Sequence, residues 1–127
     1  MTAYTQKINE LTDINFRNVH QIERVISAKK FIDLNFDKPI SLGIIATAIH
    51  CSKFHLNREF KRLYGFTPAK YLREKRIQEA RKILTNYGTV ADACFKVGYE
   101  SFSTFSLLFK RMTGKNAVHF KTARMKK

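Results

Sequence analysis

The hydrophobic pattern is clearest between residues 41 and 71, which read SLGIIATAIHCSKFHLNREFKRLYGFTPAKY. At the start of this stretch, apolar residues recur at i, i+3, i+4 and i+7: Leu42, Ile45, Ala46 and Ile49. This spacing collects apolar side chains on one side of a helix. The pattern therefore predicts a short amphipathic helix with a buried apolar face.

A second helix is predicted after a break at residues 50–51. Ser52 is a typical N-cap residue and Gly65 a typical terminator. The apolar stripe between them is expected to be Leu56, Phe60 and Leu63. The opposite face carries donors, acceptors and one aromatic, again at i, i+3, i+4 and i+7: Phe54, Asn57, Arg58 and Lys61. Two short helices with a tight turn, the second exposing such side chains, are what a helix-turn-helix needs to enter the major groove of DNA.

The residues before this region are expected to form an arm and a bracing helix. Five apolar residues predict an amphipathic helix from His20 to Phe36: Ile22, Val25, Ile26, Ile32 and Phe36. Asp37, Lys38 and Pro39 should end it. Residues 1–18 show weak periodicity and no caps, so they are expected to form an arm, or a short docked helix through Ile8, Leu11 and Ile14.

A longer helix is predicted to follow the first pair. Thr67 and Pro68 are a typical N-cap and first helical residue, and the pattern runs to about Thr85. The positions expected to face inward are Leu72, Ile77, Ala80, Ile83 and Leu84. At about 1.5 Å per residue this helix is roughly 26 Å long.

The apolar spacing of residues 42–49 recurs in the second half of the chain. Thr89 and Asp92 predict a capping box, and the apolar spacing recurs in Val90, Ala93, Cys94 and Val97. Phe60, Lys61, Arg62 and Gly65 recur as Phe109, Lys110, Arg111 and Gly114, and Ser52 recurs as Ser101. The offset is 48 in the first helix and 49 in the second, so the later turn, through Gly98 and Tyr99, has one more residue. The long helix would then connect two helix-turn-helix units at a spacing comparable with the ~34 Å of one DNA turn.

The hydrophobic content and net charge of the chain indicate which class of molecule it binds. The chain has 127 residues, 44% of them hydrophobic, which is enough for a real core. Twenty-four Lys and Arg against ten Asp and Glu give a net charge of +14, which favours nucleic acid or a lipid surface over a merely soluble basic surface. No apolar run reaches the roughly 18 residues of a membrane span, and a cytoplasmic location is expected.

The sequence gives little support for a disulfide, a metal site or an enzyme active site. Cys51 and Cys94 are expected to be free, buried thiols rather than a disulfide. His50, Cys51 and His55 lie close together but lack a second pair at ligand spacing, so no metal is expected. No phosphate loop, carboxylate pair or nucleophile turn is present, which predicts neither an enzyme nor a cofactor.

Three segments resemble the DNA-binding domain of the AraC/XylS family of bacterial transcription regulators: CSKFHLNREFKRLYGFTPAKYL, RIQEARKIL and VGYESFSTFSLLFKRMTG. The resemblance covers about residues 20 to 122, with the segments in the family's order and spacing. It implies an all-α fold of about seven helices, with two recognition helices in adjacent major grooves and RNA polymerase as a second partner. The expected parts are an arm (1–18), a first helix-turn-helix subdomain (19–66), a linker helix (67–86) and a second subdomain (87–127).

The resemblance also implies the DNA-contacting positions. In the first unit these are Phe54, His55, Asn57, Arg58 and Lys61. In the second they are Ser103, Thr104, Ser106, Leu107 and Lys110. The phosphate contacts expected around them are Lys53, Arg62, Arg73 and Arg111.

Two departures from the family pattern concern the second unit. Leu107 lies where the family often has Arg, and Asn116-Ala117 replaces the usual Thr-Pro. Because only Arg58 can make a bidentate bond to guanine, the first unit is expected to dominate specificity.

The sequence thus predicts a regulator that binds double-stranded promoter DNA sequence-specifically, as a monomer and without a small-molecule ligand. One alternative is an architectural protein that coats DNA without sequence preference, for which the charge alone suffices. Another is a protein adaptor that uses Phe54, Phe102 and Tyr99 as an exposed apolar patch.

Overall fold

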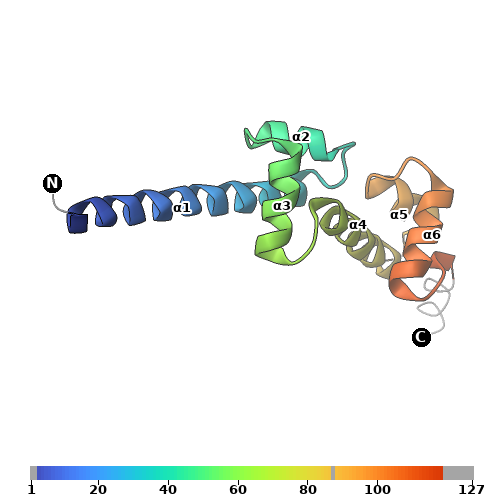
Figure 1. The fold of residues 1–127 in the computed structure, drawn as a ribbon. Helices are drawn as coiled ribbons and strands as arrows, with labels where there is room; N and C mark the ends of the chain where they lie inside the picture. Colours follow the sequence, from blue (N-terminus) through green and yellow to red (C-terminus); the bar gives the residue numbers. More distant parts are fainter. Residues whose placement is uncertain (1–2, 87, 119–127) are drawn as a thin grey trace. The chain divides into compact units, whose positions relative to one another are not determined.

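The computed structural model describes residues 3–86 and 88–118, with side chains from residue 18 onward, and these residues form an all-α protein (Figure 1). The helices are α1 (Ala3–Asn35), α2 (Leu42–Ala48), α3 (Lys53–Tyr64), α4 (Pro68–Thr85), α5 (Val90–Lys96) and α6 (Phe102–Thr113). The all-α prediction is confirmed. The expected seventh helix falls mostly on residues outside the described ranges.

The chain divides into two compact units that interleave in sequence. The first comprises Met1–Phe31 and Leu42–Pro68, and the second Ile32–Ser41 and Ala69–Lys127. Thus α2 and α3 belong to one unit, while α4, α5 and α6 belong almost entirely to the other. Each unit contains one complete helix-turn-helix pair.

Helix α1 corrects the expected boundary between an arm and a helix. It begins at Ala3 rather than near His20 and continues unbroken to Asn35. Residues 3–35 contain no Gly or Pro, so the sequence has nothing that interrupts a helix there. Because the first half of α1 has only weak hydrophobic periodicity, the sequence did not predict that the helix extends through it.

The core of the first unit contains apolar residues from α1, α2 and α3: Val25, Ala28, Ile45, Ala46, Leu56 and Phe60. Two parts of the predicted core are wrong. Leu63 is 43% exposed while Glu59 is only 9% exposed, and on α1 both Ile22 and Ile26 are exposed. On each helix the buried face is rotated away from the predicted stripe, because neighbouring helices cover only part of an apolar face.

The second unit buries a cluster contributed by α4, α5 and α6: Ile77, Ala80, Leu84, Ala93, Cys94, Val97, Tyr99, Phe105, Phe109 and Ala117. The predicted bounds of α4 are confirmed, and Leu72 and Ile83 are partly buried. The loop after α1 is fixed to α4 by Arg76. Its Nε donates to the carbonyl of Phe36 at 2.7 Å, and its Nη2 donates to that of Lys38 at 2.9 Å.

The internal repeat is confirmed helix by helix. The bounds of α2 and α5 differ by 48 residues and those of α3 and α6 by 49, so the extra residue lies in the second turn. The first turn has His50 at φ 59° where the second has Gly98 at φ 100°. Both residues adopt the left-handed conformation that ends a helix, which glycine reaches without strain and histidine tolerates.

The caps repeat as well. Ser52 Oγ accepts the backbone N–H of His55 at 3.1 Å, and Ser101 Oγ accepts that of Thr104 at 3.3 Å. Gly65 and Gly114 end the two helices at φ 85° and 79°. The predicted capping box between Thr89 and Asp92 is also present. These local signals fix where α3 and α6 begin and end.

Candidate nucleic-acid interface

The outward face of α3 presents the side chains that the sequence predicted. Asn57, Arg58 and Lys61 are exposed, Phe54 is 75% exposed, and His55 is partly buried. Leu56 and Phe60 hold the opposite side of the helix in the core. The exposed row is therefore oriented by packing behind it, and it can contact a surface that approaches the first unit.

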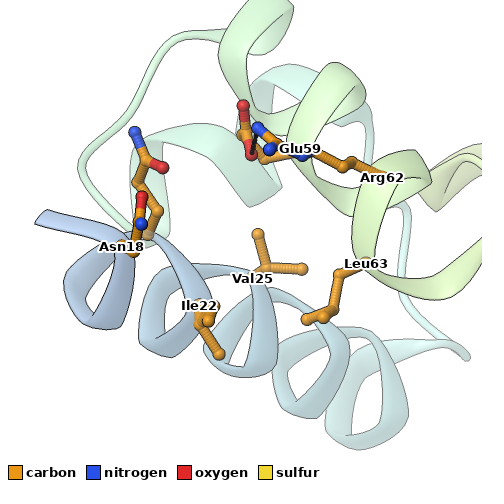
Figure 2. A pocket seen from close by; sticks show the side chains of 7 residues that line it. Asn18, Ile22, Val25, Glu59, Arg62 and Leu63 are labelled. Atoms are coloured by element: carbon orange, nitrogen blue, oxygen red, sulfur yellow. Dashed lines mark ion pairs between the residues drawn. The ribbon is translucent and has the colours of Figure 1, made fainter. Parts of the chain in front are cut away.

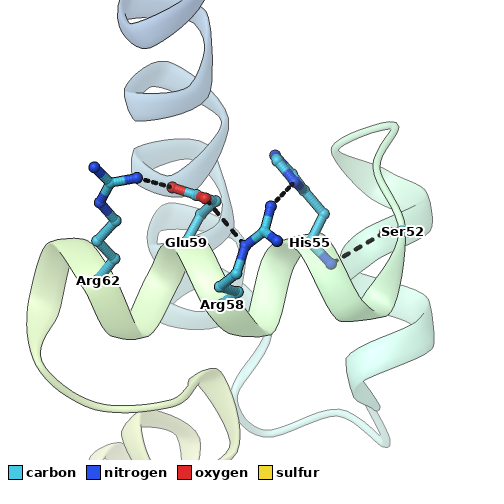
Figure 3. A network of polar contacts seen from close by, with 5 residues as sticks. All are labelled: Ser52, His55, Arg58, Glu59 and Arg62. Atoms are coloured by element: carbon cyan, nitrogen blue, oxygen red, sulfur yellow. Dashed lines mark hydrogen bonds and ion pairs between the residues drawn. The ribbon is translucent and has the colours of Figure 1, made fainter.

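Arg58 is the centre of a polar network on this face (Figure 3). Its Nη2 lies 3.3 Å from Nδ1 of His55, and its guanidinium carbon lies 5.5 Å from the ring centre of Phe54. A guanidinium over an aromatic ring is attracted to the negative face of the ring. Three predicted contact residues thus form one cluster.

Glu59 is part of this network and was missed by the sequence interpretation. Its carboxylate lies 3.4 Å from Nε of Arg58 and 3.9 Å from Nη1 of Arg62 (Figure 3). Arginine partners on both sides make burial of the charged group tolerable. The sequence signal that could have identified Glu59 is an acidic residue between Leu56 and Phe60, within the predicted apolar stripe. Glu59 restrains two arginines that were expected to contact DNA.

The outward face of α6 has a different chemistry. Ser103, Thr104 and Lys110 are exposed, and Ser106 is partly buried. Leu107 is 67% exposed, so it does not pack into the core. This face offers hydroxyls, one ammonium and one isobutyl group, and it has no arginine at the position equivalent to Arg58.

The four predicted phosphate-binding residues are all exposed: Lys53, Arg62, Arg73 and Arg111. In the second unit, Arg73 and Arg111 line one hollow of about 350 Å³ with Lys70. Sequence reasoning did not include Lys70, although it lies one helical turn before Arg73 on α4. Two helices thereby contribute three cations to a single hollow, which Glu74, Leu108 and Met112 also line.

The remaining predictions concern the adaptor patch, the two cysteines, a metal site and a membrane span. Tyr99 is buried, so it cannot belong to the exposed patch of the adaptor hypothesis. Cys94 is a free, buried thiol, as predicted, whereas Cys51 is free but only partly buried. Burial raises the pKa of both thiols. Within residues 3–86 and 88–118, no three potential metal ligands of the His, Cys, Asp or Glu type lie together, and no helix is both long and apolar enough to span a bilayer.

Comparison with known proteins agrees with the paired helices. The profile of a helix-turn-helix domain family matches residues 45–123, which include both pairs. The chain belongs to the AraC/XylS family of transcription regulators. It is therefore a DNA-binding domain of that family, as the three sequence segments had indicated.

Individual relatives are consistent with this family. The chain is 31% identical over 93 residues to the bifunctional transcriptional activator and DNA repair enzyme AdaA of Bacillus subtilis, which covers 72% of this chain and 44% of AdaA. The match thus spans less than half of that relative. The fold is similar to the C-terminal domain of the response regulator AraT from Geobacillus stearothermophilus, with a TM-score of 0.77, 23% identity, and coverage of 80% of this chain and 85% of that one. It is also similar to the DNA-binding domain of AdpA in complex with a target DNA, with a TM-score of 0.68, 20% identity, and coverage of 81% and 90%.

Proposed function

We propose that this chain binds promoter DNA sequence-specifically, with α3 and α6 inserted into adjacent major grooves. The observation that carries the proposal is the repeated design of the two helices. Each has a serine N-cap, a glycine terminator, a face held in a core and an exposed face rich in hydrogen-bonding groups. The complex of AdpA with its target DNA supports a DNA-binding role for this fold.

In this proposal the first unit is the main reader of sequence. The guanidinium of Arg58 can donate two parallel hydrogen bonds to guanine, and the amide of Asn57 can do the same with adenine. Phe54, His55 and Lys61 flank them on the same part of α3. On α6, Leu107 can contact only a thymine methyl group, while Ser103, Thr104 and Ser106 can bond to several bases.

The basic side chains would position the protein on the backbone without reading sequence. Lys53 and Arg62 do this for the first unit, and Arg73 and Arg111 do it for the second. Because Arg62 is paired with Glu59, its guanidinium reaches a phosphate from a restrained position. Lys110 is exposed on α6 and would contribute in the same way.

The remaining parts of the proposal concern partners and chemistry. We assign this region no catalytic role and no cofactor, since its exposed residues suit recognition. The name of AdaA includes a DNA repair activity, but this chain matches less than half of AdaA, so we do not assign that activity to it. Contact with RNA polymerase and a cytoplasmic location follow from regulation of bacterial promoters.

A selection from random DNA, followed by footprinting of the selected site, tests the proposal. We expect protection over about two helical turns on one face, with half-sites about 10 base pairs apart. Unrelated DNA should compete poorly at physiological salt. Equal competition by any DNA would support the architectural alternative instead, and protection of one groove would show that α6 does not engage.

A further inference from the structure

His55 and Arg58 lie one turn apart on α3, and their side chains contact one another. Nη2 of Arg58 lies 3.3 Å from Nδ1 of His55. Because an arginine can only donate hydrogen bonds, Nδ1 of His55 is the acceptor and has no proton. The imidazole form that meets this condition is the neutral tautomer with its proton on Nε2. The contact therefore assigns both the charge state and the tautomer of His55.

The same guanidinium is held on its other side by Glu59. Figure 3 shows His55 and Glu59 on either side of Arg58, and Nε of Arg58 lies 3.4 Å from Oε1 of Glu59. These contacts use Nε and one N–H of Nη2. Nη1 and the second N–H of Nη2 remain, and they are a parallel pair of donors that a guanine can accept. The two neighbours thus restrain the arginine and leave donors available for reading a base.

Glu59 is shared between two arginines, so it does not hold Arg58 alone. Its carboxylate also lies 3.9 Å from Nη1 of Arg62. Glu59 and Arg62 line a hollow of about 290 Å³ between α1 and α3 (Figure 2). The residues that α1 contributes to this hollow are uncharged: Asn18, Gln21, Ile22 and Val25. The charge of Glu59 is therefore balanced by its two arginines, and each receives only part of its attraction.

Protonation of His55 would turn this contact from attraction into repulsion. A protonated imidazole has an N–H at both nitrogens, so it cannot accept a hydrogen bond from Arg58. The positive ring and the guanidinium would then be like charges separated by 3.3 Å. Arg58 would turn away from the ring and lose one of its two polar restraints. Histidine is the side chain that changes charge between about pH 5 and 8, so the change falls near neutral pH.

The elements around His55 also contain other titratable groups. Helix α2 has none, since its sequence is LGIIATA. In the turn before α3, burial raises the pKa of the Cys51 thiol, so this thiol stays uncharged near neutral pH. Arg24 of α1, whose charge acts on that thiol, stays protonated. Among the described residues of α2, this turn and Arg24, only His50 changes charge in the same range, which makes it the matched control for His55.

We propose that His55 is a positioning residue for Arg58, so that reading of sequence by α3 requires an unprotonated His55 and weakens as the pH falls from about 8 to about 5.5. This inference rests on the proposed function, because it concerns the arginine proposed to read guanine. Affinity for unrelated DNA should not fall at the same time, since a protonated histidine is attracted to phosphate. On α6 the equivalent positions are Thr104 and Leu107, which do not titrate. The pH dependence is thus a property of the first unit.

Anisotropy titrations of the preferred site and of unrelated DNA, from about pH 5.5 to about pH 8 at constant ionic strength, test the proposal. The readout is discrimination, defined as the ratio of the two dissociation constants. Protonation of histidines that contact only phosphate changes both affinities alike and cancels in this ratio. For the wild type, discrimination should fall by about threefold to tenfold at the acidic end. Circular dichroism at each pH checks that the protein stays folded.

Three variants separate His55 from other causes of pH dependence. His55→Asn places an amide oxygen near the position of Nδ1 and does not titrate, so it should restore discrimination at acidic pH and remove the pH dependence. His55→Leu has no acceptor, so it should lower discrimination at every pH to the acidic value of the wild type. His50→Asn is the matched control and should keep the wild-type profile, because asparagine tolerates the φ of 59° at this position.

A measurement on the free protein tests the contact independently of DNA binding. Heteronuclear NMR of the imidazole nitrogens should show the proton of His55 on Nε2 at about pH 8, and the Nε signal of Arg58 should shift as His55 titrates. A proton on Nδ1 at that pH, or a His55→Asn variant that keeps the pH dependence, would overturn the role of His55. Discrimination that is high but constant with pH would overturn this role alone. Equal affinity for the two DNAs at every pH would overturn the proposed function itself.

Discussion

The Nε atom of Arg58 lies 3.4 Å from Oε1 of Glu59, so an exposed arginine is fixed by a carboxylate that is almost buried in the core. The same carboxylate lies 3.9 Å from Arg62. The arginine proposed to read a base and one proposed to contact phosphate therefore share one anchor. A rigid anchor reduces the rotamer entropy that a long side chain loses on binding.

Glu59→Gln should reduce discrimination between the preferred site and unrelated DNA. The amide keeps the shape of the side chain but removes the charge that restrains Arg58. We expect a loss of roughly 0.5–1.5 kcal/mol on the preferred site. Affinity for unrelated DNA should not fall, because a negative charge near the interface has been removed. Titrations of both DNAs, with the melting temperature as a folding control, check this, and parallel losses on the two DNAs would contradict it.

Arg58→Ala should cost about 1–3 kcal/mol on the preferred site and relax the preference at one or two base pairs. Unrelated DNA should lose much less affinity, because it offers no matched base to this residue. Repeating the DNA selection with the variant measures the relaxed positions. Arg62→Ala is the matched control, expected to weaken both DNAs alike and to reduce the salt slope by about 1.

Leu107→Ala should have a smaller effect, under about 1 kcal/mol, because it removes only an apolar contact to a thymine methyl or a sugar. Leu107 is exposed, so the melting temperature should not change. The selected sequence should remain almost the same. If Leu107→Ala altered the selected sequence while Arg58→Ala weakened all DNA equally, the first unit would not be the main reader.

Arg76→Ala should destabilise the second unit by about 1–3 kcal/mol. The guanidinium donates to two backbone carbonyls after α1 and lies 5.2 Å from the ring centre of Tyr99. Its loss leaves these groups without their charged partner. Urea denaturation measures the change, and Arg73→Ala, an exposed arginine one turn earlier on α4, should leave stability close to wild type.

Binding to the preferred DNA should depend steeply on salt. With roughly 6 to 10 phosphates neutralised, log K against log salt should have a slope of about −5 to −9. Fluorescence anisotropy from about 50 to 200 mM salt gives the slope. A slope shallower than about −2 would be incompatible with a basic DNA-binding surface of this size.

The sequence by itself determined the local architecture. The bounds of α3 and α6, the serine caps, the glycine ends and the repeat follow from hydrogen bonds between residues a few positions apart. Such signals are complete within a short segment, so they can be interpreted without knowing the fold. The exposure of Phe54 and Arg58 was also predicted, because the two sides of a short amphipathic helix differ strongly in polarity.

Only the tertiary structure decided which part of each apolar face is covered. Leu63, Ile22 and Ile26 belong to apolar faces in the sequence but remain exposed, whereas Glu59 is buried. The approach of Arg73 and Arg111 to one hollow also depends on how α4 and α6 pack. Burial of a given side chain depends on where a neighbouring helix begins, ends and crosses, and helical periodicity contains no information on any of these.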